Sequence, residues 1–276
     1  MKKTITVLIL IGIIPIFLFE SSIAQGLKNN NIKWSTNNPF KTDVFVENLG
    51  QFDSWAKTSA PIKYAVNNDY KVLFTQQGLT YKLVKMENIS EEEREEIEKK
   101  EGKEPIPGID IYYVNMRWVG CNENSVLEVS EESEGYYTFA EKGYENVQAK
   151  GYKKLLYKEL YPGIDVEYII PEKGGIKYSL IIRPGADVSK VKMKYTGDFD
   201  KIENSADGNI LINTPLGKIT DHAPQSFYKG TSEKINPIAI GSAFKLKENT
   251  VSFQLSTPNL PTGQAGSQLP TPNYYY

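Results

Sequence analysis

Apolar and polar side chains alternate most regularly between Tyr157 and Gly197. Apolar residues occupy every second position in three runs, Ile164–Ile170, Ile176–Ile182 and Val191–Tyr195, and most of the positions between them are polar or charged. Because successive side chains of a strand point to opposite faces, a period of two predicts extended strands with one apolar face. We therefore predict three consecutive strands, joined as an antiparallel meander.

Turn-forming residues separate these runs. Proline presets φ for a turn, glycine accepts positive φ, and aspartate can bond to the backbone two residues further on. The segment from Pro171 to Gly175 therefore predicts a hairpin loop of about five residues. The site residues that we single out are structural turn positions, with no catalytic, cofactor-binding or metal-binding residue among them. They are Pro162, Gly163, Asp165, Gly174, Gly175, Pro184, Gly185, Asp187, Asp207 and Gly208.

Shorter apolar runs, bounded by turn signals at intervals of about 8 to 12 residues, fill most of the remaining chain. This spacing is typical of an antiparallel β-sandwich. We predict an all-β fold, built as one body or as two packed subdomains that meet near residues 135–150. Further strands are predicted at residues 43–47, 62–66, 70–75, 79–86, 109–119, 126–129, 136–139, 152–157, 210–214, 218–221, 226–229, 238–247 and 250–255.

Residues 87–104 depart from this pattern and carry nine acidic and four basic side chains. Ser90 followed by Glu93 is a capping-box signature, and Gly102 can end a helix, so a short acidic helical insertion is predicted. Because Ile97 is the only aliphatic residue inside this helix, it has no apolar face to bury. The insertion is either a docking site for a basic partner or, as charge runs usually are, a solvated excursion between two strands.

Three segments of the sequence are distinctive in combination: LYPGIDVEY (160–168), IKYSLIIRPGADVSKVKMKYTG (176–197) and DGNILINTPLGKITDHAPQSF (207–227). Together with FVENLGQF at 45–52, they resemble the uncharacterised N-terminal module that precedes SBBP-type β-propeller repeats in large secreted bacterial proteins. Many of those proteins also carry a C-terminal sorting domain of the gliding-associated (type IX) secretion system. The resemblance covers roughly residues 40–255. It implies an exported module with C-terminal propeller repeats in the same chain, and it brings no established activity.

The first 24 residues have the composition of a signal peptide. Lys2 and Lys3 form a basic start, about 15 apolar residues follow, and Ser22–Ala24 forms a small-residue cleavage site. The apolar run is shorter than the roughly 20 residues of a membrane span, so an anchor is the weaker interpretation. We predict a signal peptide at 1–24, a disordered lead-in at 25–41, the β-rich module at 42–256, and a Pro/Gly/Asn-rich linker or truncated end at 257–276.

The composition offers little for catalysis or charge-driven binding. The formal net charge is −2, and no apolar run after the leader reaches spanning length, so we expect neither nucleic acid nor a membrane span. One cysteine, Cys121, and one histidine, His222, are too few for a zinc or copper site. A dyad of the two is conceivable, although nothing in the sequence brings them together. We predict a protein without cofactor or enzymatic activity.

Eighteen tyrosines and three tryptophans leave one binding function open. Tyrosines are good sheet formers, whereas an exposed row of rings could stack on sugars. The leading prediction is an exported, non-catalytic structural or interaction module, secreted or on the outer cell surface, with an unknown protein or glycan partner. The alternative is a secreted carbohydrate-binding module. A weaker one is a glycoside hydrolase, which would need two carboxylates facing across a cleft.

Overall fold

The computed structural model describes residues 6–7, 11–13, 44–67, 71–139, 143–171, 174–229 and 238–256. Apart from the helix α1 (Glu91–Glu101) and the 3₁₀ turn η1 (Val188–Lys190), the regular structure of these residues is β, which confirms the predicted fold class. The strands are β1 (Thr6–Val7), β2 (Ile11–Ile13), β3 (Phe45–Glu47), β4 (Ile62–Asn67), β5 (Lys71–Thr75), β6 (Gly78–Met86), β7 (Ile109–Trp118), β8 (Val126–Glu132), β9 (Gly151–Tyr161), β10 (Ile164–Ile169), β11 (Ile176–Ile182), β12 (Lys192–Gly197), β13 (Lys201–Asn204), β14 (Ile210–Thr214), β15 (Gly217–Asp221), β16 (Ser226–Lys229), β17 (Ile238–Ile240), β18 (Ser242–Lys247) and β19 (Thr250–Leu255).

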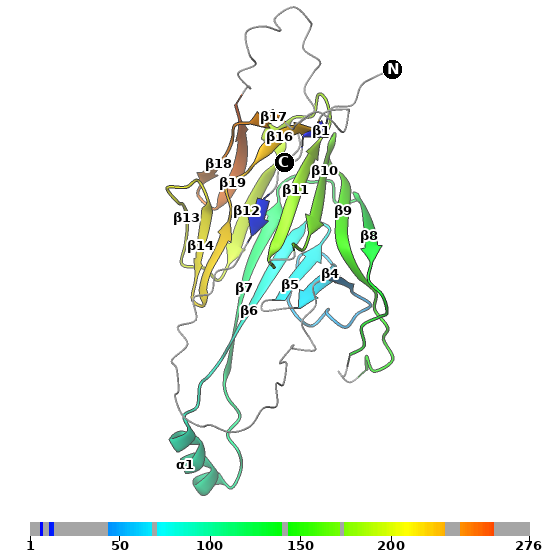
Figure 1. Ribbon diagram of the computed structural model, residues 1–276. Coiled ribbons are helices and arrows are strands. Elements are labelled where there is room, and N and C mark those ends of the chain that lie inside the picture. The colour runs from blue at the N-terminus through cyan, green and yellow to red at the C-terminus, as the bar shows by residue number, and fades with distance from the viewer. Residues whose placement is uncertain are drawn as a thin grey trace, which may run out of the picture.

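One long antiparallel sheet contains most of the strands. Its order is β13-β14-β15-β2-β11-β10-β9-β3-β4-β5-β6-β7-β12-β19-β18, with β8 beside β9, and a smaller sheet has the order β1-β16-β17. The long sheet folds back on itself. Nε1 of Trp118 on β7 donates a hydrogen bond of 2.9 Å to the hydroxyl of Tyr168 on β10, although these strands are not neighbours. The two parts of the sheet therefore face each other across a core, as in a sandwich (Figure 1).

Two clusters of buried apolar side chains fill the body. The larger cluster lies between the facing parts of the sheet and includes Trp118 and Tyr168. The smaller cluster lies against the opposite face of β3–β5. Strand β5 contributes to both, because Val72 and Phe74 belong to the larger cluster and Leu73, between them, to the smaller one. A strand that is covered on both faces has a continuous apolar run instead of an alternating one.

The predicted meander is wrong in its third strand. Strands β10 and β11 form the expected antiparallel hairpin, with Ile164 opposite Ile182. Strand β12, however, pairs with β7 and β19, far from β11 in the sheet order. The connection from Arg183 to Val191, which contains η1, is long enough to cross to the facing part of the sheet. Alternation predicts which face of a strand is apolar, but it does not specify the strand's neighbours.

Two other predicted strands also differ from the structure. Residues 136–139 do not form a strand. Tyr137 makes an isolated bridge with Ala149, and bends and turns in the neighbouring residues keep this pairing from extending. The predicted strand at 238–247 divides at Gly241, so that β17 pairs with β16 in the smaller sheet and β18 pairs with β19 in the larger one. A Cβ atom at Gly241 would lie 2.1 Å from Oγ of Ser256, so a larger residue at this division would require the Ser256 side chain to move.

Helix α1 has the ends that the sequence predicts. Ser90 is its N-cap, and Oγ of Ser90 accepts a hydrogen bond of 3.2 Å from the backbone N–H of Glu93. The Glu93 carboxylate accepts one of 3.1 Å from the backbone N–H of Ser90 in return, which completes the capping box. Gly102 ends the helix in the left-handed conformation, with φ of 66°. The acidic helical insertion is confirmed.

Several predicted segments fall outside the described residues. The lead-in at 25–41 and the linker at 257–276 lie there entirely, and the signal peptide at 1–24 does so except for β1 and β2. The backbone of β2 pairs with β11 and β15, and the backbone of β1 pairs with β16. The leader and its cleavage stay predictions. No helix in the described part of the chain combines the length and apolarity that a membrane crossing requires.

Candidate functional site

The predicted turn residues lie between strands of the body. Gly163 (φ 75°) connects β9 to β10, Gly174 and Gly175 (φ 81° and 82°) precede β11, and Gly208 (φ 79°) lies between β13 and β14. Gly185, with φ of 79°, follows Pro184 after β11. A left-handed backbone favours glycine because the residue has no Cβ atom. The structure therefore places these glycines where they shape connections.

Asp165 has a role that alternation did not predict. Its carboxylate is buried, accepts a hydrogen bond of 2.7 Å from the backbone N–H of Glu159, and forms an ion pair of 2.6 Å with Arg183. Arg183 also pairs with the Glu159 carboxylate, which accepts a hydrogen bond of 2.9 Å from the backbone N–H of Gly163. These contacts tie the β9–β10 turn to the end of β11. Asp187 caps η1 by accepting a hydrogen bond from the backbone N–H of Ser189.

Asp221 lies fully buried in the body. It accepts hydrogen bonds of 3.1 Å from the hydroxyls of Tyr178 and of Tyr195. Burial raises the pKa of this carboxyl to about 7, although the two tyrosine hydroxyls lower it. Perturbed acids are common in active sites. All three side chains are enclosed, however, so the group is a polar contact inside the core and no substrate could reach it in this conformation.

The cysteine and the histidine do not form a dyad. Cys121 follows β7 at the margin of the larger core, and burial raises the pKa of its thiol. His222 follows β15, and its Nε2 atom is buried without a hydrogen-bond partner. No hydrogen bond joins the two side chains in the described part of the chain. Within the same residues, no three side chains of the metal-binding types cluster together.

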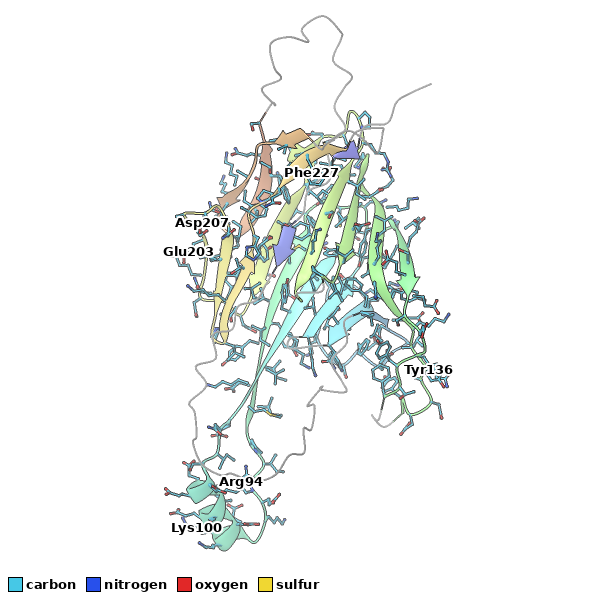
Figure 2. The ribbon with its side chains drawn as sticks, in the orientation of Figure 1. Arg94, Lys100, Tyr136, Glu203, Asp207 and Phe227 are labelled. Carbon is cyan, nitrogen blue, oxygen red and sulfur yellow. The ribbon has the colours of Figure 1, made fainter. Side chains whose placement is uncertain are left out.

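Most aromatic rings point into the body. Trp118 and Tyr178, for example, pack edge to face with their ring centroids 5.7 Å apart. Among the described residues, Tyr136 is the one exposed large aromatic side chain, and Figure 2 shows it on the loop between β8 and β9. The described surface therefore lacks the row of rings on which the carbohydrate-binding alternative depends.

The most prominent surface feature is a two-stranded ribbon that leaves the body. Beyond the other strands, β6 and β7 continue as a pair that ends in α1 (Figure 1). The pairing extends to Met86 opposite Ile109, and the backbone N–H of Glu87 donates a hydrogen bond of 2.8 Å to the carbonyl of Gly108. We call residues 84–111 the arm.

One face of the arm is apolar and exposed. Val84 lies opposite Ile111, and Met86 lies opposite Ile109, so all four side chains project from the same face of the ribbon. They are 42–67 % exposed, and Ile106, just before β7, is 92 % exposed. A contiguous apolar patch of this kind on a soluble surface is typical of a site that binds another molecule.

The tip of the arm is strongly charged. Helix α1 has no buried residue, and it begins with three consecutive glutamates. Lys99 and Lys100 neutralise two further glutamates through exposed ion pairs one turn apart. Figure 2 shows Arg94 and Lys100 on this helix, at the far end of the arm. The arm thus combines an apolar ribbon face with a predominantly acidic tip.

The sequence predicted the tip of the arm and missed its apolar face. The residue pattern predicts strands at 79–86 and 109–119 without indicating that one end of each leaves the body. The apolar positions change face where the body ends: Leu79, Tyr81 and Leu83 lie on the core face of β6, whereas Val84 and Met86 lie on its opposite face. The structure shows that Val84 and Ile109 are 43 % and 55 % exposed.

The fold and the arm define an all-β domain with a protruding two-stranded ribbon. The chain belongs to the family described as a domain of unknown function, DUF7948, whose model matches residues 45–262. The match includes both the body and the arm, and it begins after the predicted leader and lead-in. No curated protein and no solved structure matches the chain.

Proposed function

We propose that this protein is an exported, non-catalytic interaction module that binds a partner polypeptide through its arm. The observation that carries the proposal is the exposed apolar face formed by Val84, Met86, Ile109 and Ile111. It stands on a ribbon outside the body, so a partner can reach it without disturbing the core. The predicted leader and the resemblance to modules that precede propeller repeats support a location at the cell surface or outside the cell.

The energetics of the arm favour binding. Fully burying one exposed apolar side chain of this size contributes roughly 1.5–3 kcal/mol, and the four side chains of this face, which are 42–67 % exposed, would each contribute part of that. The cost of ordering is small, because paired strands already fix the backbone. The acidic tip adds charge complementarity, which increases the rate of encounter with a basic partner more than the final affinity. A partner with an apolar stripe beside basic residues fits this surface.

The test uses a photo-reactive side chain at Ile109, introduced into the full chain in its native host. Cross-linking is performed on intact cells and on the culture medium. We expect a discrete adduct with one other polypeptide, because Ile109 would be buried in the complex. The double variant Val84→Thr, Ile111→Thr keeps β-forming residues but removes apolar area. It should lower the adduct yield about tenfold or more, since each 1.4 kcal/mol changes affinity tenfold.

Val126→Thr is the matched control. Val126 is also an exposed valine on a strand, at 60 % exposure, but it lies on β8 of the body. This variant should leave the adduct unchanged. An equal loss in Val126→Thr, or no adduct from Ile109 in any fraction, would contradict the proposal.

A further inference from the structure

A second surface lies at the body end of the same two strands. Loop residues 57–59 and strands β6, β7 and β12 enclose a hollow of about 380 Å³. Its floor is built from two parallel rows of side chains. Gly78, Arg117 and Lys194 lie side by side across the three strands, and Thr80, Asn115 and Thr196 form the neighbouring row.

Gly78 makes room in the first row. Its φ is 150°, and a Cβ atom there would lie 2.0 Å from the backbone carbonyl oxygen of Met116. Strand β6 therefore needs glycine to approach β7 at this point. Gly78 thus lines the hollow beside Arg117 without a side chain of its own.

The hollow is positively charged. Arg117 and Lys194 lie directly opposite each other on paired strands, and Lys57 lines the hollow from the loop. Like charges in this position destabilise a sheet. Arg117 forms an exposed ion pair of 3.2 Å with Glu123, whereas neither Lys57 nor Lys194 forms an ion pair with any described residue. Among the described residues, no acidic side chain lines the hollow.

The second row supplies hydrogen-bonding groups. The hydroxyl of Thr80 donates a hydrogen bond of 2.7 Å to Oδ1 of Asn115, and Nδ2 of Asn115 donates one of 3.5 Å to the carbonyl of Thr196. The hydroxyls of Thr58 and Ser59 also line the hollow. Hydroxyls and amides that both donate and accept suit a ligand rich in hydroxyl groups.

We propose that this hollow binds an acidic saccharide, with Lys57, Arg117 and Lys194 contacting its carboxylate or sulfate groups and the threonine–asparagine row contacting its hydroxyls. An anion between Arg117 and Lys194 relieves their mutual repulsion. The site is distinct from the arm, so either can exist without the other.

The probe is tri-galacturonic acid, titrated calorimetrically into the full chain, with the fully methyl-esterified trimer as its uncharged counterpart. The acid should bind at least tenfold more tightly than the ester and should weaken as salt is added, because exposed charges are screened. The double variant Lys57→Gln, Lys194→Gln should lose tenfold or more in affinity for the acid. Lys153→Gln, an exposed lysine on β9, is the matched control and should bind normally.

A stability readout separates recognition from folding. Lys194→Gln should raise the thermal midpoint of the free protein slightly, because it removes one of two facing like charges. The proposal would be overturned if the ester or hexaglutamate bound as tightly as tri-galacturonic acid. It would also be overturned if Lys153→Gln weakened binding as much as Lys57→Gln, Lys194→Gln does, or if neither tri-galacturonate nor a sulfated disaccharide bound. Hexaglutamate binding would show that the hollow responds to charge alone.

Discussion

The carboxylate of Asp221 lies inside the core between the hydroxyls of Tyr178 and Tyr195. Water is excluded from this position, so the charged form loses its hydration and two hydrogen bonds compensate only in part. Burial consequently raises the pKa of Asp221 to about 7, well above its ordinary 3.8. The folded chain therefore holds this proton more tightly than the unfolded chain does.

Asp221 makes stability depend on pH. Between about pH 4 and pH 7 the folded state keeps a proton that the unfolded state releases, so the free energy of unfolding falls as the pH rises through this window. The slope from this one group is at most about 1.4 kcal/mol per pH unit. Denaturant unfolding measured from pH 4 to pH 8 should show the decline.

Asp221→Asn is the variant that isolates this contribution. Asparagine can accept from one tyrosine hydroxyl and donate to the other, and it carries no charge. The variant should be more stable than the parent at pH 8, and its decline with pH should be shallower. A variant whose pH profile matches that of the parent would show that Asp221 does not titrate in this range.

At the scale of the element, helix α1 is held by its ends. The capping box at Ser90 and the C-cap at Gly102 satisfy backbone hydrogen-bonding groups at the two ends of the helix. No residue of α1 is buried, so packing contributes little to its stability. The hydrogen bonds that the Glu93 carboxylate accepts from Ser90 hold the pKa of this carboxyl below its ordinary value. The helix is therefore a local unit, whose stability should be separable from that of the body.

Ser90→Ala tests this independence. Loss of an N-cap hydroxyl typically costs a helix about 1 kcal/mol. Amide exchange in α1 should accelerate about fivefold, and the pKa of Glu93 should rise toward its ordinary value. The thermal midpoint of the body should change by no more than about 1 °C. Ser90→Asp, which keeps an N-cap acceptor, should restore slow exchange. A fall of several degrees in the midpoint of Ser90→Ala would mean that α1 packs on the body.

At the scale of the whole molecule, the arm and the body are expected to be energetically separate. The larger core includes β6 and β7 only as far as Leu83 and Tyr112, and the exposed apolar residues begin with Val84 and Ile111, on the opposite face of the two strands. The paired positions Val84 and Ile111 are close enough for a two-residue turn to join them.

Replacing residues 85–110 by Asn-Gly removes the arm beyond its first pair of residues. The free energy of unfolding should change by less than about 1 kcal/mol, because the excised residues are exposed. Urea unfolding followed by tryptophan fluorescence would measure it, since Trp55 and Trp118 lie in the two cores. Added in excess as a competitor, the shortened chain should not lower the adduct yield of the full chain, and it should still bind tri-galacturonate. Loss of folding would show that the arm supports the body.

The sequence determined the features that depend on neighbouring residues. Alternation gave the apolar faces of β10, β11 and β12, glycine and proline gave the turns at 163, 174–175 and 208, and the capping box gave both ends of α1. These features are local, because φ preferences and side-chain period act over a few residues. The acidic tip of the arm was predictable for the same reason.

The tertiary structure alone decided which strands are neighbours. Alternation in β12 is equally compatible with pairing to β11, as predicted, and with pairing to β7, as observed. The hollow depends on this pairing, because Thr80, Asn115 and Thr196 come from three segments that are distant in the sequence. The burial of Asp165 and Asp221 and the exposure of the arm likewise depend on what covers a strand. Long-range packing decides which elements cover a strand, and no local pattern of residues encodes that packing.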